Sequence, residues 1–253
     1  MDTSAILRTS SHRPWPLPAG PWILMQRWHE LLFAHWPIEP EILRPLLPPG
    51  LTLDTYEGQA WVGVVPFRAS QVVPRGLPTV PGLSQFPEIN VRTYVTVNEQ
   101  AGVYFFSLDA ANPLAVVLAR TFFHLPYFHA KMRCQRVGRP RDGNVRYWSH
   151  RTHRNAPPAD FVATYHPLAP VAYAHPGTLE HWLTERYCLY TVVGRDRVYR
   201  CDIHHRRWPL QVADADILCN TMALSHTIHL PDMPPLLHYA HQLDVVFWPL
   251  RRE

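Results

Sequence analysis

The chain has 253 residues, 47% hydrophobic and 17% charged, which is typical of a folded globular protein and not of a disordered one. Its formal net charge is +4, but the arginines are scattered and form no continuous basic stripe, which argues against nucleic-acid binding. No apolar stretch approaches the roughly 18 to 20 residues that a membrane-spanning helix requires, and no secretory signal pattern is present. We therefore expect a cytoplasmic protein without nucleic-acid or membrane partners.

The N-terminal segment differs in composition from the rest of the chain. Residues 1–21 contain several prolines and no hydrophobic periodicity, which predicts an irregular arm. A single β-barrel domain is expected over 22–253, a length that can bury one core. A short helix is predicted over 40–47, because proline suits the first helical turn and Pro48-Pro49-Gly50 prevents continuation.

Two strands and a long loop follow. A strand is predicted over 60–67, and the proline-rich segment 74–87 predicts a loop long enough to act as a lid or binding loop. The segment 88–97 alternates strictly, which predicts a strand that pairs with 103–108 in a hairpin. One face of it carries Ile89, Val91, Thr93, Val95 and Val97, and the other carries Glu88, Asn90, Arg92, Tyr94 and Thr96.

A helix and a strand with one polar face come next. Asn112 and Pro113 suit the N-cap and first position of a helix that reaches about His124. The strand predicted over 127–135 has an apolar face and a polar one, the latter made of Tyr127, His129, Lys131, Arg133 and Gln135. The sequence leaves open whether this polar face looks into a cavity or into solvent.

The remaining elements complete a chain in which strands dominate. We expect strands over 145–152 and 242–248, a hairpin of 187–193 with 197–205, and short helices over 179–186 and 215–225. Consecutive strands joined by tight turns pair antiparallel, so the predicted fold is mainly β (α+β), with a closed or nearly closed antiparallel sheet and a few short helices.

Seven segments resemble, in the same order, the YqjF-like family of uncharacterised proteins. They are LLFAHWP (31–37), LLPPGL (46–51), AWVGVVPF (60–67), EINVRTYV (88–95), GVYFFSLDA (102–110), LPY (125–127) and IHHRRWPL (203–210). That family is grouped with the acetoacetate decarboxylase-like β-barrels. The resemblance therefore implies a closed antiparallel barrel with an internal cavity.

The resemblance also locates a site. In acetoacetate decarboxylase the Schiff-base lysine and a second lysine directly follow a proline at a helix-to-strand junction, opposite a glutamate on a neighbouring strand. The matching junction here is Leu125-Pro126, where Tyr127 and Phe128 stand in the places of the two lysines. Glu88 matches the cavity glutamate by its place at the start of its strand. The absence of lysine at positions 127 and 128 argues against decarboxylation by the mechanism of acetoacetate decarboxylase.

Lys131 is the only lysine among 24 basic residues, so it is the one side-chain candidate for amine catalysis. An amine becomes a nucleophile near neutral pH only if burial or a nearby cation lowers its pKa from about 10.4. Inside a barrel, burial and Arg133 on the same face would both act in that direction. The alternative is a lysine that faces solvent on an edge strand.

Glu88, Asn90 and Arg92 offer a carboxyl, an amide and a guanidinium on one face. Facing inward, Arg92 would bind a substrate carboxylate and Glu88 would act as general acid or base, whereas the alternative is an internal ion pair. Arg120, late on its helix, would either contribute to the same cavity or bond the last helix carbonyls.

The 16 histidines do not predict a metal site, because their paired spacings would not converge on a strand and no carboxylate accompanies them. One of His204 and His205 must face inward, and His204 is taken here as a ligand-binding candidate with Tyr127 and His129. No cofactor is expected, since the chain has no phosphate-binding glycine loop, serine-hydrolase elbow or dinucleotide fingerprint.

Two functions remain open. The first is a lyase-like or acid–base enzyme, with imine chemistry as one version, that acts on a small organic acid or carbonyl compound in the barrel. The second is a non-catalytic barrel that binds or senses such a small molecule. A homo-oligomer is left open.

Overall fold

The computed structural model describes residues 3–78, 85–138 and 143–253. Its 13 strands form one sheet. The strands are β1 (Leu24–Ile38), β2 (Thr52–Leu53), β3 (Ala60–Pro74), β4 (Gln85–Val97), β5 (Gln100–Ala110), β6 (Tyr127–Arg136), β7 (Val145–Arg151), β8 (Asp160–Pro167), β9 (Cys188–Val193), β10 (Arg197–His205), β11 (Gln211–Asn220), β12 (Leu236–Phe247) and β13 (Arg251–Arg252). The α-helices are α1 (Thr3–Arg8), α2 (Pro40–Leu43), α3 (Pro113–Phe122) and α4 (Leu179–Thr184), with 3-10 turns at Arg44–Leu46 and Leu224–His226.

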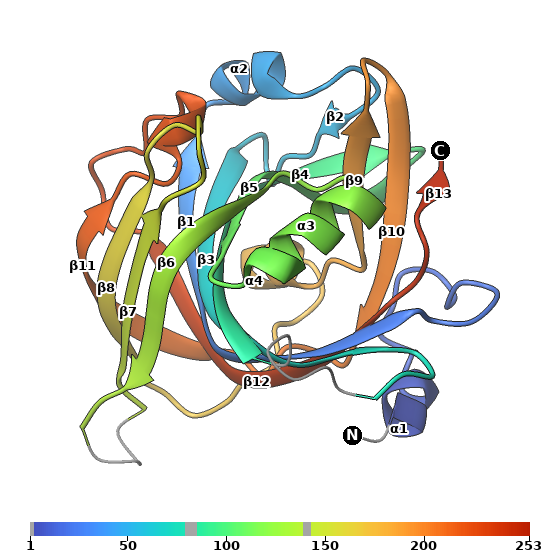
Figure 1. Cartoon of the computed structure of the whole chain (residues 1–253), viewed down its shortest axis with the longest axis horizontal. Helices are drawn as coiled ribbons and strands as arrows, with labels where there is room; N and C mark the ends of the chain where they lie inside the picture. Colours follow the sequence, from blue (N-terminus) through green and yellow to red (C-terminus); the bar gives the residue numbers. More distant parts are fainter. Residues whose placement is uncertain (1–2, 79–84, 139–142) are drawn as a thin grey trace.

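The strand pairings close two rings that share the strands β12, β1, β3, β4 and β5. The first ring runs β1, β3, β4, β5, β9, β10, β12 and back to β1. The second leaves β5 through β6, β7, β8 and β11 and returns at β12. In Figure 1, β6, β7, β8 and β11 lie on one side of the shared strands, and β9 and β10 lie on the other.

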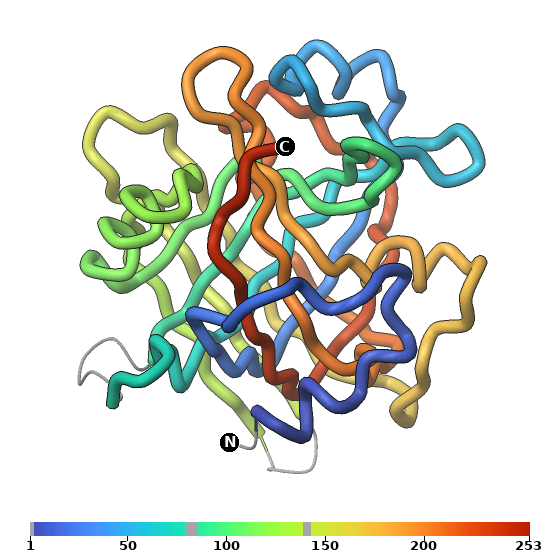
Figure 2. The backbone as a smooth tube through the Cα atoms, turned by 90° about the vertical axis from the view of Figure 1, so that its right-hand side faces the viewer, coloured from blue at the N-terminus to red at the C-terminus, as the bar shows by residue number. Residues whose placement is uncertain are grey.

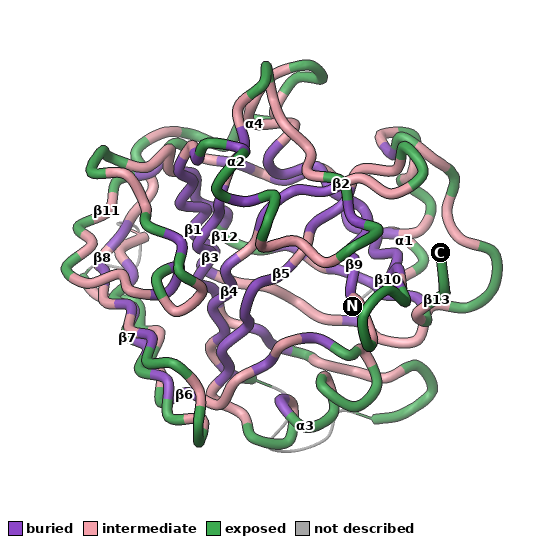
Figure 3. Tube along the Cα trace, turned by 90° about the horizontal axis from the view of Figure 1, so that it is seen from above, coloured by how far each residue is buried: buried purple, intermediate pink, exposed green. Residues whose placement is uncertain are grey.

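The shared strands are buried on both faces because each face lines a different ring. On β1, for example, Leu31 and Phe33 pack in the core of the first ring, while Leu32 and Ala34 pack in the core of the second. Figure 3 shows β1, β3, β4 and β5 largely buried. In contrast, β7 alternates between buried and exposed residues, and β6 after Ala130 is partly buried or exposed. Sheets buried on both sides need apolar residues at nearly every position, and residues 31–34 of β1, 62–67 of β3 and 103–106 of β5 meet this need.

Helix α3 connects two parallel strands. Asn112 caps it, since its side chain accepts hydrogen bonds from the backbone N–H groups of Leu114 and Ala115. The chain then enters β6, which pairs parallel to β5, as a helical crossover allows. The predicted helix after Asn112 is confirmed, and the predicted barrel of mainly β structure is found. The pairing is not purely antiparallel, however, because β5 runs parallel to both β6 and β9.

The N-terminal arm packs on the outside of the first ring. Helix α1 lies within the segment that was expected to be irregular. Arg13 is buried and donates a hydrogen bond to the carbonyl of Ile203, at 2.6 Å, and the His12 ring bonds the carbonyl of His205, at 2.8 Å. Figure 2 shows this arm crossing the outside of the strands near the C-terminal segment.

One predicted element is of the wrong type, and one predicted strand is confirmed but begins earlier in the structure. The helix predicted over 215–225 is instead mostly strand β11, in which Ala213, Ala215 and Ile217 face the core of the second ring and the residues between them are exposed. Strand β12 begins at Leu236, before the strand predicted over 242–248. Within the loop predicted over 74–87, residues 79–84 lie outside the described part of the chain. None of the described helices is long and apolar enough to cross a membrane.

Candidate functional site

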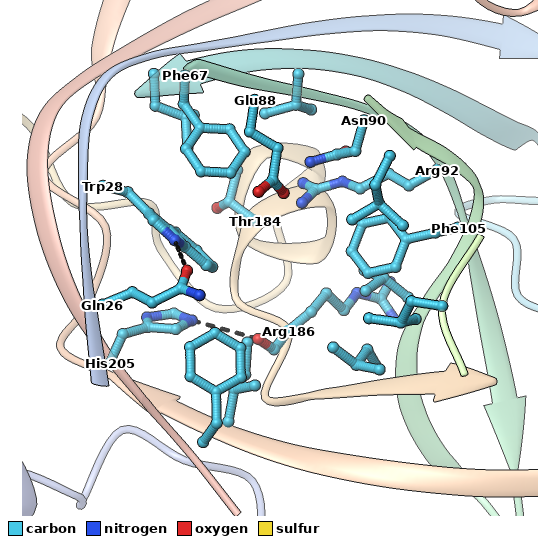
Figure 4. Close-up of a pocket in the computed structure, with 18 of the residues that line it drawn as sticks. Gln26, Trp28, Phe67, Glu88, Asn90, Arg92, Phe105, Thr184, Arg186 and His205 are labelled. Carbon is cyan, nitrogen blue, oxygen red and sulfur yellow. Dashed lines mark hydrogen bonds between the residues drawn. The ribbon is translucent and has the colours of Figure 1, made fainter. Parts of the chain in front are cut away.

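The first ring encloses a cavity of about 80 Å³, called here the first-ring cavity. Its polar lining residues come from distant parts of the chain, as Figure 4 shows. The lining comprises Gln26, Trp28, Leu31, Val65, Phe67, Glu88, Asn90, Arg92, Val103, Phe105, Leu108, Leu125, Tyr127, Thr184, Arg186, Leu189, Ile203, His205, Trp208 and Phe247. This volume suits a small organic molecule, because a cavity holds one water molecule in about 10 to 15 Å³.

Strand β4 supplies three of the polar groups. Glu88, Asn90 and Arg92 all line the cavity, as the alternation of β4 predicts, while Ile89 and Val91 pack into the core of the second ring. Figure 4 shows the three polar side chains extending from one strand into the same space. The sequence left open whether this face looks inward, and the structure directs it into the cavity.

Glu88 is a buried carboxyl group. Burial raises its pKa to about 8, and the nearby charge of Asp109 acts in the same direction. The Tyr127 hydroxyl donates a hydrogen bond of 3.0 Å to Glu88 Oε1, which partly offsets the rise in pKa. Glu88 is therefore mainly protonated at neutral pH but ionises near pH 8, so both forms are accessible to it.

Tyr127 reaches the cavity because of where β6 begins. Tyr127 pairs with Leu108 of β5, and both residues line the cavity. From Ala130 onward β6 pairs with β7 and no longer follows β5. The same face of β6 then looks outward, so Lys131 is exposed and does not line the cavity. The expectation that burial and Arg133 would act on Lys131 inside a barrel is thus corrected, since both residues are exposed.

Arg92 is partly buried and has no carboxylate partner among the described residues. No ion pair joins it to a carboxylate of the described residues, and its Nε is buried without a hydrogen-bond partner. Its Nη2 makes long contacts of 3.4 Å to the Tyr94 hydroxyl and 3.3 Å to the Leu183 carbonyl. The guanidinium also lies 5.1 Å from the centre of the Phe33 ring, a cation–π distance. These contacts leave Arg92 able to bind an anion.

A second arginine, Arg186, was not singled out from the sequence. It follows α4, and its Nη1 donates to Asp54 Oδ2 at 2.6 Å while its Nε donates to the Trp182 carbonyl, also at 2.6 Å. Its Nη2 is buried without a partner, and burial lowers its pKa. No local sequence pattern distinguishes Arg186, because its site depends on ring closure between segments far apart in the chain.

His205 and not His204 lines the cavity. The two ring nitrogens of His205 lie 2.7 and 3.3 Å from the carbonyl oxygens of Arg206 and Arg186. Burial lowers its pKa, and the neutral ring donates a hydrogen bond to only one of the two. His204 faces the opposite side of β10, where its ring bonds the carbonyl of Ile6 in α1 at 3.0 Å. The choice of His204 as a ligand-binding residue is thus wrong, since alternation on β10 turns its neighbour inward.

The two other candidates lie outside the first-ring cavity. His129 is half-buried, and its Nδ1 lies 3.1 Å from the Thr152 hydroxyl. Arg120 is exposed and donates a hydrogen bond of 2.7 Å to the Tyr127 carbonyl, so it steadies the start of β6. Within the described residues, no group of three or more His, Cys, Asp or Glu side chains is placed to hold a metal ion.

The fold is similar to that of known enzymes. Acetoacetate decarboxylase from Legionella pneumophila superposes with a TM-score of 0.61 at 13% identity, over 98% of this chain and 95% of that one. The enduracididine biosynthesis enzyme MppR, complexed with pyruvate, superposes with a TM-score of 0.62 at 12% identity, over 94% and 93%. At this identity the likeness defines the fold alone, which is acetoacetate decarboxylase-like.

Sequence comparison gives the family. The model of the DUF2071 family, described as an uncharacterized conserved protein, matches residues 25–244. The uncharacterized protein YqjF of Bacillus subtilis is 50% identical over 236 residues, which are 93% of this chain and 95% of that protein. The chain therefore belongs to the DUF2071 family, and the resemblance inferred from its seven segments is confirmed.

Proposed function

We propose that this protein is an acid–base enzyme that binds a small organic acid with a carbonyl group in the first-ring cavity and moves a proton on the carbon beside that carbonyl. The observation that carries the proposal is a buried carboxyl group of raised pKa, Glu88, on the same strand face as a partly buried guanidinium, Arg92, that has no carboxylate partner among the described residues. In this proposal Arg92 binds the substrate carboxylate and Glu88 transfers the proton.

Arg92 accounts for the binding of an acid. A buried charge is costly unless it is paired, and a ligand carboxylate would supply both the counter-charge and acceptors for the open N–H groups. The MppR structure with bound pyruvate supports this ligand class, because that protein shares the fold. The volume of the cavity also favours an acid of this size.

Glu88 accounts for the proton transfer. General acid–base catalysis is most effective when the pKa of the group lies near the working pH, and the pKa of Glu88 is about 8. In its ionised form Glu88 would take a proton from the carbon beside the carbonyl. The C–H bond breaks, the Glu88 O–H bond forms, and the electron pair moves to the carbonyl oxygen as an enolate. Return of a proton from Glu88 reverses the step.

Imine formation is not part of the proposal. It requires an amine in the cavity, and Lys131, the only lysine, is exposed on the outer face of β6. Tyr127 occupies the place where the related decarboxylases carry lysine, and its hydroxyl can only support Glu88 by hydrogen bonding.

Hydrogen–deuterium exchange tests the proposal without knowledge of the final product. The protein is incubated in D2O with pyruvate, 2-oxobutyrate or acetoacetate, and loss of the proton signal beside the carbonyl is followed by NMR. Exchange above the rate in buffer with at least one acid is the expected result. Binding of these acids without exchange would contradict the enzyme and leave the non-catalytic binding barrel as the function.

Replacing Arg92 by Met is expected to weaken binding of the exchanging acid by about 10- to 100-fold, because the hydrogen bonds of the guanidinium to a carboxylate are worth about 1.5 to 3 kcal/mol. Isothermal titration calorimetry measures the affinity. The matched control is Arg133→Met on the exposed face of β6, which should bind as the wild type does. Equal loss in both variants would contradict the role of Arg92.

Replacing Tyr127 by Phe is expected to shift the pH dependence of exchange upward. The Tyr127 hydrogen bond lowers the pKa of Glu88, so its removal raises that pKa above about 8. Because the ionised form takes the proton, the rising limb of the rate profile should move by about 1 to 2 pH units, the equivalent of one charged hydrogen bond. Rates measured from pH 6 to 10 test this, and a downward shift would refute it.

A further inference from the structure

We propose that Arg186 is a second substrate-binding residue, that it and Arg92 hold one carboxylate between them, and that Asp54 adjusts the charge of the pair so that the cavity selects monocarboxylates over dicarboxylates. This inference rests on the proposed function, because it concerns the same cavity. It adds a residue and a selectivity that the sequence does not indicate.

The two guanidinium groups lie against one aromatic ring. The central carbon of Arg92 is 5.7 Å from the centre of the Tyr94 ring, and that of Arg186 is 4.9 Å from it. Trp182 packs 4.6 Å from Tyr94 and also contacts Arg186, at 4.3 Å. The Tyr94 hydroxyl lies 2.7 Å from Nε2 of the fully buried His35, which fixes the ring. Tyr94 therefore packs against both arginines, and both arginines line the cavity.

Each arginine keeps one buried nitrogen without a partner. These are Nε of Arg92 and Nη2 of Arg186. Both arginines line the cavity. Buried donors in folded proteins are nearly always hydrogen-bonded, so an unpartnered donor on each of these two residues points to an acceptor supplied by a ligand. The two oxygens of a single carboxylate match two donors from neighbouring guanidinium groups.

The charges around the cavity balance one anion. Asp54 pairs with Arg186 at 2.6 Å and neutralises it, whereas no described carboxylate pairs with Arg92. The remaining titratable groups in the lining are Glu88, protonated at neutral pH, Tyr127, and His205, whose lowered pKa keeps it neutral. His35, behind Tyr94, is neutral for the same reason. The groups that line the cavity, taken together with Asp54, therefore carry a net charge of +1, and a second ligand carboxylate would lack a counter-charge among them, which is costly.

Asp54→Asn provides the sharpest test, because it keeps an acceptor for Arg186 Nη1 and removes only the charge. Pyruvate and malonate are the probes, two three-carbon acids with one and two carboxylates, and calorimetry at pH 7 gives their affinities. The wild type should prefer pyruvate by at least about tenfold, and in Asp54→Asn the ratio should fall by about tenfold or reverse, a change of roughly 1.4 kcal/mol.

The matched control is Asp244→Asn. Asp244 also pairs with an arginine, Arg27, but on the face of β12 that does not line the cavity. This variant should keep the wild-type ratio. A ratio that does not change in Asp54→Asn, or that changes equally in Asp244→Asn, overturns the inference.

A second variant guards against misfolding of the first. Arg186→Lys keeps the charge but lacks the Nη2 donor, so it should weaken pyruvate binding by about tenfold in a protein with unchanged circular dichroism. Unchanged binding overturns the role of Arg186. If carboxylate binding depends on Arg92 but its affinity is unchanged in both Asp54→Asn and Arg186→Lys, only this inference fails. If the wild type binds no carboxylate at all, the proposed function fails with it.

Discussion

Glu88→Gln is expected to slow deuterium exchange by about 10²- to 10⁴-fold, the usual contribution of a positioned general acid or base. Glutamine has nearly the same shape and still accepts the hydrogen bond from Tyr127, but it cannot take or return a proton. The affinity for the acid should change little, because Arg92 supplies the counter-charge. NMR exchange rates and calorimetry measure the two effects separately.

The control for this variant is Glu41→Gln, which removes a carboxylate whose side chain is 71% exposed on α2. Its exchange rate should equal that of the wild type. If Glu88→Gln exchanges as fast as the wild type while binding the acid, Glu88 is not the proton-transfer group and the proposed chemistry is refuted.

The largest effect on stability is expected at a buried ion pair in the second ring. Arg151 of β7 donates two hydrogen bonds of 2.7 Å to the carboxylate of Asp109 on β5, and both side chains are almost fully buried. Arg151→Leu would leave Asp109 charged and unpaired in the core. The free energy of unfolding should fall by about 3 to 5 kcal/mol, as measured by urea denaturation.

A double variant and a second pair provide the comparison. Asp109→Leu combined with Arg151→Leu removes both charges and should recover most of the lost stability. Arg27→Leu breaks a pair whose side chains are each about one-fifth exposed, and it should cost less. If the double variant is no more stable than Arg151→Leu, the cost does not come from an unpaired charge.

The sequence predicts the polar lining residues of β4 but not Arg186 or its partner Asp54. Glu88, Asn90 and Arg92 could be grouped because strict alternation over one strand is a local signal. Tyr127 could be identified as a candidate because it directly follows the junction Leu125-Pro126, which the family resemblance indicates as the site. Arg186 and Asp54 could not be found in this way, because the ion pair that links them joins positions far apart in the chain, and only closure of the first ring brings Arg186 to the cavity.

The same reasoning explains the errors in the fold. Strand β1 was not predicted, because a strand that is buried on both faces loses the period-two pattern by which strands are recognised. Strand β11 was taken for a helix although its exposed residues, such as Asp214 and Asp216, alternate with core residues. Lys131 and Tyr127 share a strand face by parity, but β6 leaves β5 between them.

The wall that the two rings share also makes strand register a condition for function. On β4 the polar side chains face one ring and the apolar side chains face the other. A slip of one residue against β3 would exchange the two sets, so that Glu88, Asn90 and Arg92 would enter a dry apolar core while Ile89 and Val91 filled the cavity. Burying these three polar groups without partners would destabilise the shifted pairing. The native pairing, which assembles the site, is therefore favoured during folding.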